Sequence, residues 1–253
     1  MPRARPQRRD TLEVRLPDGR EARVLRVIDP RARHLRLLLS ARGPRLTVPA
    51  GVSEREALGF LDRHLGWLAD QMAEDPGAPT PHAALRPGES GCVPLRGCRL
   101  ALSWRSGRWL RVAQQDDQLL IDLPPNAPEA ALHRALREFL LSEARADVGR
   151  WLPHYLPGLP RAPRLWRIRP LASLWGSMSA SGTLSLDLAL VLGPPEAFRY
   201  VLVHELCHLI QPNHSPAFWQ EVERRFPDWR AQRRYLRGEG LALKTSLRAL
   251  LRE

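Results

Sequence analysis

The stretch from Tyr200 to Trp219 constrains this chain more than any other, because it places ionisable side chains at helical spacing inside an apolar pattern. It contains His204, Glu205 and His208 in the order H-E-x-x-H. Residues four apart lie on one face of a helix, so the two histidines can present their imidazoles to one metal ion. Glu205 is one residue further round, where its carboxylate can accept a proton from a water molecule without binding the metal itself.

A catalytic zinc ion usually has three protein ligands and one open position, and the sequence offers His214 as the third ligand. Pro212 must end the motif helix, because proline cannot continue the hydrogen-bond ladder. Ser215 and Pro216 fit the N-cap and first residue of a new helix, so His214 lies at a corner from which it can point back. We expect one Zn²⁺ per chain at this site, although three histidines also accept cobalt, nickel or copper.

The alternative is that the motif occurs by chance on an ordinary amphipathic helix. The apolar residues around it do repeat at helical spacing, and Pro194-Pro195-Glu196 ahead of them is a typical helix start. However, unpaired polar groups are costly to bury, and this helix would carry two histidines and a glutamate without partners. The pattern therefore favours metal binding.

Four short runs around the motif are similar to those of a known family. They are Trp175-Gly176-Ser177-Met178-Ser179, Gly182-Thr183-Leu184-Ser185-Leu186, Pro194-Pro195, and Asn213-His214-Ser215-Pro216 followed by Phe218-Trp219. Together with the motif they resemble the YgjP-like zinc metallopeptidases, which are akin to the SprT-like minimal gluzincins. The resemblance implies a zinc hydrolase with His204, His208 and His214 as metal ligands and Glu205 as catalytic base. The chain departs from the family at Leu174, where arginine is usual, and at Met178, where cysteine is usual.

Three further residues are candidates for supporting roles in the site. Trp175 and Asn213 belong to the runs that carry the resemblance, and they are candidates for contacts around the metal ligands. Tyr235 follows the motif, and its phenol could donate a hydrogen bond to the negative charge that develops on a carbonyl oxygen. An ordinary core or surface position is the alternative for this tyrosine.

The remaining patterns predict an α+β fold. Alternating apolar residues over 11–48, interrupted by turn signals, predict a basic antiparallel sheet at the N-terminus. Ser53 to Glu56 is a capping box that opens a helix to about Met72. Leucines that recur every four residues after Pro128 predict a long helix. We expect this long helix to pack against the H-E-x-x-H helix in a minimal gluzincin-like zincin domain.

These patterns divide the chain into a disordered basic tail (1–10), a β-rich unit with a helix (11–75), a linker (76–91), a zinc metallopeptidase-like domain (92–240) and a C-terminal helix (241–253). Within the fourth segment, residues 164–192 are expected to form strands, with leucines alternating from Leu184 to Leu190. The free edge of such a strand could receive a substrate chain as an added strand. An ordinary internal strand is the alternative.

The formal net charge of +12 is concentrated in residues 1–50, which contain thirteen arginines and five acidic residues. A basic end of this kind can bind nucleic acid or an acidic partner by releasing counterions. The alternative is a solvated arginine face on a sheet, and the scarcity of nearby aromatic residues to stack on bases favours it.

The three cysteines are an odd number without a disulfide-like framework, which indicates a reducing compartment. No apolar segment follows the basic N-terminal residues, so we expect no secretory signal. No apolar run reaches the length of a membrane helix. We therefore expect a cytoplasmic protein with no membrane partner, and the oligomeric state is left open.

These observations lead to three hypotheses about function. The first is a zinc-dependent metallopeptidase that hydrolyses bonds of a peptide or protein substrate with a metal-activated water and Glu205 as general base. The second keeps the metal site but makes the chain a metal-dependent phosphohydrolase acting on nucleotides. The third is a nucleic-acid-associated protein or protease that uses the basic N-terminal unit.

Overall fold

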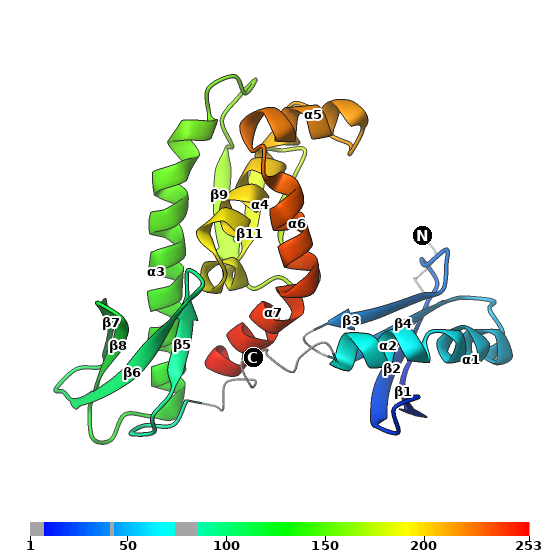
Figure 1. Ribbon diagram of the computed structural model, residues 1–253, viewed down its shortest axis with the longest axis horizontal. Helices are drawn as coiled ribbons and strands as arrows, with labels where there is room; N and C mark the ends of the chain where they lie inside the picture. Colours follow the sequence, from blue (N-terminus) through cyan, green and yellow to red (C-terminus); the bar gives the residue numbers. More distant parts are fainter. Residues whose placement is uncertain (1–7, 41–42, 74–84, 253) are drawn as a thin grey trace, which may run out of the picture. The chain divides into compact units, whose positions relative to one another are not determined.

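The computed structural model describes residues 8–40, 43–73 and 85–252, which form the expected α+β fold (Figure 1). They divide into two compact units, within Met1–Ala78 and Pro79–Glu253, and each unit has its own apolar core. The expected tail and linker lie mostly outside the described residues, although Leu85 of the linker is buried in the core of the second unit. In the described part of the chain, no helix is both long enough and apolar enough to cross a membrane.

The N-terminal unit is a four-stranded sheet packed against two helices. The single helix expected to run to about Met72 is interrupted at His64, which caps the first of the two. Its elements are β1 (Arg8–Arg15), β2 (Glu21–Asp29), β3 (Arg36–Ser40), β4 (Gly43–Pro49), α1 (Glu54–Arg63) and α2 (Leu65–Ala73). The strand order is β1-β2-β4-β3, and the sheet is mixed, not wholly antiparallel as expected. The reason is that β4 returns between β2 and β3, so it runs parallel to β2 and antiparallel to β3.

The first strand begins at Arg8, so the expectation of a disordered tail is wrong for residues 8–10. These residues pair with the end of β2, and the Asp10 carboxylate accepts hydrogen bonds from Arg26. Arg26 also pairs with Glu54, so part of the charge of this unit is neutralised within it. Nucleic-acid binding by the unit stays a prediction.

The second unit opens with a sheet of the same topology. Its strands are β5 (Cys92–Leu95), β6 (Cys98–Ser106), β7 (Arg111–Gln115) and β8 (Gln118–Leu123), in the order β5-β6-β8-β7 with a parallel central pair. In the β5–β6 turn, Arg96 and Gly97 both have positive φ, as a two-residue type I′ turn requires. Their backbone N–H groups donate to the carbonyls of Val191 and Leu192. The turn is therefore hydrogen-bonded to the segment that precedes the motif helix.

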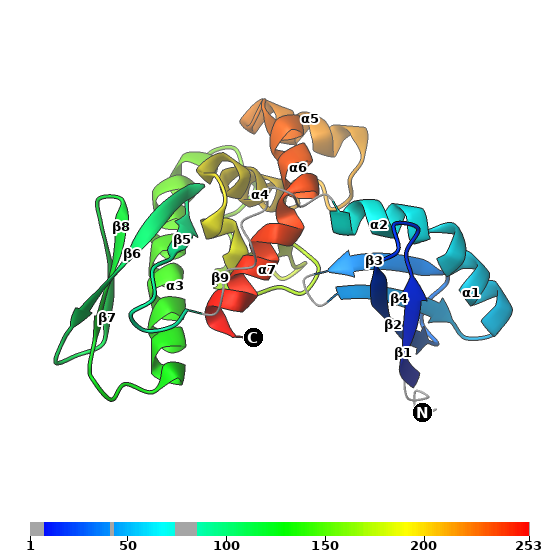
Figure 2. The ribbon, with the colours of Figure 1, turned by 60° about the horizontal axis from the view of Figure 1, so that its bottom comes forward.

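The rest of the second unit is built around a long helix. Its elements are α3 (Glu129–Tyr155), β9 (Leu165–Arg169), β10 (Gly176–Met178), β11 (Thr183–Asp187), the 3₁₀-helix η1 (Leu188–Leu192), α4 (Pro195–Cys207), α5 (Pro216–Arg225), α6 (Trp229–Gly238) and α7 (Gly240–Leu251). Helix α3 packs against α4, α7 and β7 (Figure 1, Figure 2). The predicted packing of the long helix on the motif helix is confirmed, for example by the edge contact of Trp151 with Phe198.

The strand ahead of the motif helix is shorter than the leucine alternation predicts. Strand β11 ends at Asp187, and the next five residues form η1. The Asp187 side chain causes this change, because it accepts the backbone N–H of Ala189 as a cap and pairs with Lys244 of α7. In the three-stranded sheet the order is β10-β11-β9, so β11 has partners on both sides and is the internal strand that the alternative describes. Strand β10 lies at one edge of this sheet, next to β11.

Candidate metal centre

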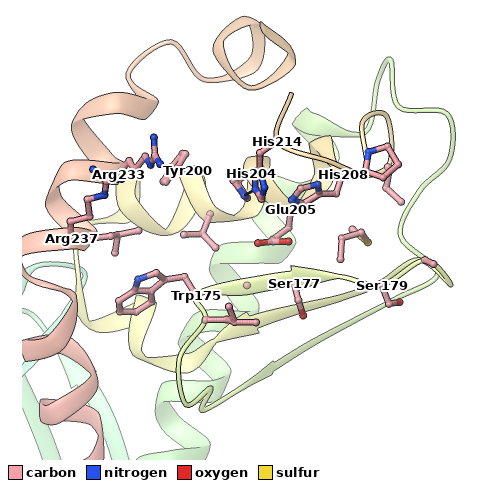
Figure 3. Close-up of a pocket in the computed structure, with 18 of the residues that line it drawn as sticks. Trp175, Ser177, Ser179, Tyr200, His204, Glu205, His208, His214, Arg233 and Arg237 are labelled. Atoms are coloured by element: carbon pink, nitrogen blue, oxygen red, sulfur yellow. Dashed lines mark hydrogen bonds between the residues drawn. The ribbon is translucent and has the colours of Figure 1, made fainter. Parts of the chain in front are cut away.

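Three histidine side chains meet on one side of the motif helix. His204 lies on α4, His208 is the C-terminal cap of that helix, and His214 lies in the turn before α5. One ring nitrogen from each residue lies within 4.8 Å of the other two, and Nε2 of His204 is 3.0 Å from Nε2 of His214 (Figure 3). The structure therefore brings together the three residues for which the sequence predicts metal binding.

A helix cap and one buried ring position the turn that carries His214. The Ser215 hydroxyl accepts the backbone N–H of Phe218 and caps α5, which begins at Pro216 as predicted. The Phe218 ring is fully buried and contacts all three imidazoles. Its centroid lies 4.9, 4.6 and 4.8 Å from those of the three histidines in chain order. The ring thus forms an apolar floor beneath the site.

The three imidazoles fit a bound metal ion. His208 Nδ1 lies 3.1 Å from the Gln211 carbonyl oxygen and can donate its proton there, which leaves Nε2 free as a ligand. Burial, reinforced by the two neighbouring histidines, lowers the pKa of His204 to about 3. Its ring is therefore neutral, as metal binding requires. Zinc binds imidazole nitrogen at about 2.0–2.1 Å, so nitrogens this close together suit one ion.

Glu205 is buried against the edge strand β10. A Cβ atom added to Gly176 would lie only 2.6 Å from the Glu205 Cγ atom. Burial raises the pKa of Glu205 to about 8, and the Met178 backbone amide opposes this shift. A cation held by the histidines would also favour the charged carboxylate. The side chain is thus confined between the motif helix and β10, next to the histidines.

The histidines and Glu205 line a cavity of about 920 Å³ between α4, α6 and β10. Its other walls include Trp175, Tyr200 and two arginines of α6, Arg233 and Arg237. The H-E-x-x-H motif itself gives no indication of Tyr200, Arg233 or Arg237. Tyr200 could be anticipated, because it lies four residues before His204 on the same helix face. The arginines come from a separate helix and reach the site only through the fold.

The supporting residues suggested by the sequence have different positions. Trp175 lines the cavity, and its ring packs on Lys244, 4.4 Å from the ammonium nitrogen. Asn213 is exposed and does not line the cavity. Tyr235 does not line it either: its hydroxyl points toward Gly193, 3.3 Å from where a Cβ would stand. Tyr235 therefore lies outside the set of residues that line this cavity.

This chain is similar to known metallopeptidases. Residues 33–239 match the YgjP-like metallopeptidase domain family. Among solved structures, the metallopeptidase zymogen of Pyrococcus abyssi abylysin has 33% sequence identity, over 40% of this chain and 91% of that chain. The TM-score of this pair is 0.28. No curated protein matches the chain.

Proposed function

The chain belongs to the YgjP-like metallopeptidase family, and from this premise we propose that it is a zinc-dependent peptidase with Glu205 as its general base. As a peptidase it acts on peptides or proteins. The observation that carries the proposal is the convergence of three imidazoles beside a buried carboxylate in one cavity. This set of groups provides both a metal site and a proton acceptor.

In this mechanism His204, His208 and His214 hold the ion. When bound, zinc supplies a nucleophilic water at neutral pH and polarises the scissile carbonyl. The Glu205 carboxylate accepts the proton of the attacking water and then delivers it to the leaving amine. Gly176 leaves the space that the Glu205 side chain occupies beside β10, and a positioned carboxylate favours proton transfer.

The substrate would be held by β10. Because β10 is an edge strand and lines the cavity, an extended peptide can pair with its free edge. Such a peptide would lie across Glu205. Tyr200 takes the role suggested above for Tyr235: burial raises the pKa of Tyr200 to about 12, so its phenol stays protonated and can donate to a developing oxyanion.

The experiment that tests the proposal combines elemental analysis with a peptide-library digest. We expect one zinc per chain in the wild type, less in His214→Ala, and full zinc content in Glu205→Gln. Peptide cleavage should fall by a factor of at least about 10² in Glu205→Gln, because a positioned acid–base group contributes about 10²–10⁴-fold. Wild-type rates in that variant would refute the general-base role.

The same preparations are offered nucleoside triphosphates. Zinc-dependent release of phosphate or pyrophosphate without any peptide cleavage would replace the peptidase proposal with the phosphohydrolase alternative. Retarded migration of DNA or RNA at low salt, lost on removal of residues 1–50, would support the nucleic-acid hypothesis.

A further inference from the structure

Two arginines of α6 carry positive charge to one end of the cavity. Arg233 and Arg237 are four residues apart, so they project from the same face of the helix, and both line the cavity. Figure 3 shows them beside Tyr200, at the end of the cavity where Trp175 lies and away from Ser179.

Neither guanidinium has a carboxylate partner in the part of the chain that the structure describes. The nearby Arg230 pairs with Glu223, whereas Arg233 lies over the ring of Trp219, 4.9 Å from its centroid. An aromatic face holds a guanidinium in place without cancelling its charge. Among the described residues that line the cavity, the sole carboxylate is Glu205. This end of the cavity therefore attracts anions.

The positive charge acts on the catalytic part of the cavity. Tyr200 lines the same cavity beside Arg233 and Arg237 (Figure 3). The Tyr200 ring contacts the ring of His204 at a centroid distance of 5.8 Å. The two cations are thus close enough to affect a substrate bound at the histidines.

The direction of β10 indicates which part of a bound peptide would meet this charge. The strand runs from the end of the cavity near Trp175 to the end near Ser179 (Figure 3). A peptide that adds to the free edge in the antiparallel sense, which is slightly the more stable pairing, runs the opposite way. If its scissile bond lies beside Glu205, the residues that follow this bond extend toward Arg233 and Arg237.

We infer that Arg233 and Arg237 form a carboxylate-binding subsite for the part of the substrate that follows the scissile bond. This inference rests on the proposed peptidase function. The preferred substrates carry a carboxylate there, supplied either by an aspartate or glutamate side chain or by the C-terminal carboxylate of a short peptide. Guanidinium groups suit this role because their planar arrangement of donors matches a carboxylate.

The test uses the full-length, zinc-loaded protein and four matched peptides. The first has alanines around the cleaved bond and an amidated C-terminus. The second has glutamate in the two positions after the cleaved bond. The third has a free C-terminal carboxylate at the end of these two positions. The fourth has glutamate before the cleaved bond. The fourth probes Arg161, which lines the other end of the cavity and donates to the Ala180 carbonyl.

We expect kcat/KM for the second peptide, the third or both to exceed that for the first by about 10-fold or more, because hydrogen bonds between charged groups are stronger than those between neutral groups. The faster of the two identifies the source of the carboxylate. In the double variant Arg233→Gln/Arg237→Gln, the ratio of anionic to neutral rates should fall to near one. Arg234→Gln should keep the wild-type ratio, because Arg234 is exposed on the same helix but does not line the cavity.

A binding measurement separates this inference from the peptidase proposal. Fluorescence anisotropy measures how tightly the Glu205→Gln variant binds each labelled peptide. These affinities should follow the same order as the kcat/KM values, without any turnover. Three results would overturn the subsite and leave the peptidase proposal intact. They are equal kcat/KM for all four peptides, a larger increase in kcat/KM for the fourth peptide than for the second and third, and an unchanged ratio of anionic to neutral rates in the double variant. Failure to cleave any peptide would count against the peptidase proposal, while the binding order would still decide on the subsite.

Discussion

Gly176 and Glu205 approach each other so closely that no side chain fits between them. A Cβ atom on Gly176 would lie 2.6 Å from Cγ and 2.8 Å from Oε1 of Glu205, closer than unbonded atoms can pack. The glycine is thus needed for space, since its φ is not in the positive region. The edge strand and the motif helix are therefore packed directly against each other at this position.

Replacing Gly176 by alanine should therefore displace the Glu205 carboxylate and leave the histidines in place. We expect Gly176→Ala to retain its zinc and to lose peptide cleavage by at least about 10²-fold, since small misplacements of a catalytic group cost this much. Zinc content and kcat/KM measure the two effects. Gly149→Ala is the matched control, because a Cβ there meets open space. Normal cleavage by Gly176→Ala would mean that the carboxylate can act from another position.

Metal removal should lower thermal stability. A ligand present at a thousand times its Kd stabilises the folded state by about 4 kcal/mol. For a unit of this size that corresponds to a midpoint shift of about 8–16 °C. A chelator should therefore lower Tm in the wild type and in His154→Ala, whose histidine is exposed on α3, and lower it less in His214→Ala, which holds less zinc. An identical chelator effect in all three proteins would contradict the three-histidine site.

Phe218 should set metal affinity through packing. Its ring supports all three imidazoles, so Phe218→Leu should loosen their arrangement and weaken zinc binding by about 10–100-fold, the usual effect of losing a group that orients metal ligands. Phe139→Leu is a control with a similarly buried phenylalanine on α3. Competition with a zinc-binding dye measures the affinity. Equal affinities in the two variants would show that the ring acts only in folding.

Lys244 should stabilise the wall of the cavity near Trp175. Its ammonium group donates to the carbonyls of Leu171 and Leu174 and pairs with the buried Asp187. Lys244→Met leaves that carboxylate without its partner, which typically costs about 3–5 kcal/mol near neutral pH. Adding Asp187→Asn should recover part of the loss, and urea denaturation measures both. If the stability change of the double variant equals the sum of the changes in the two single variants, the two residues are not coupled.

The stability loss in Lys244→Met should depend on pH. Burial raises the pKa of Asp187 and Lys244 opposes this shift, so without the lysine the folded-state pKa rises further. A group whose pKa is raised on folding contributes stability at low pH that is lost as pH rises. The free energy of unfolding of Lys244→Met should therefore be closest to that of the wild type below about pH 4, the ordinary pKa of aspartate. The difference between the two proteins should grow above that pH. A difference that is constant with pH would exclude Asp187 as its cause.

Local rules account for most of what could be predicted from the sequence. The capping interactions of Ser53 and Ser215 occur as expected, because an N-cap depends only on neighbouring residues. The meeting of His204 with His208 follows from helix geometry, and Pro212 and Pro216 fix the turn that brings back His214.

Features set by long-range contacts could not be predicted in this way. Asp187, at the end of strand β11, pairs with a lysine 57 residues further along the chain, and no local pattern signals that pair. The same holds for the parallel pairing of β2 with β4, which depends on strand order. The position of Tyr200 in the cavity follows from its place one helical turn before His204, whereas the position of Tyr235 depends on how α6 packs in the fold.

Lys244 is also the only lysine in the chain, and only 12% of its side chain is exposed. Apart from the amino terminus, amine-reactive reagents have no other primary amine to modify. The acylation rate of this one residue therefore reports how often the wall of the cavity opens. Mass spectrometry can follow this rate without a substrate, a metal or an introduced label, and surface immobilisation through amines would capture the folded chain mainly by its amino terminus.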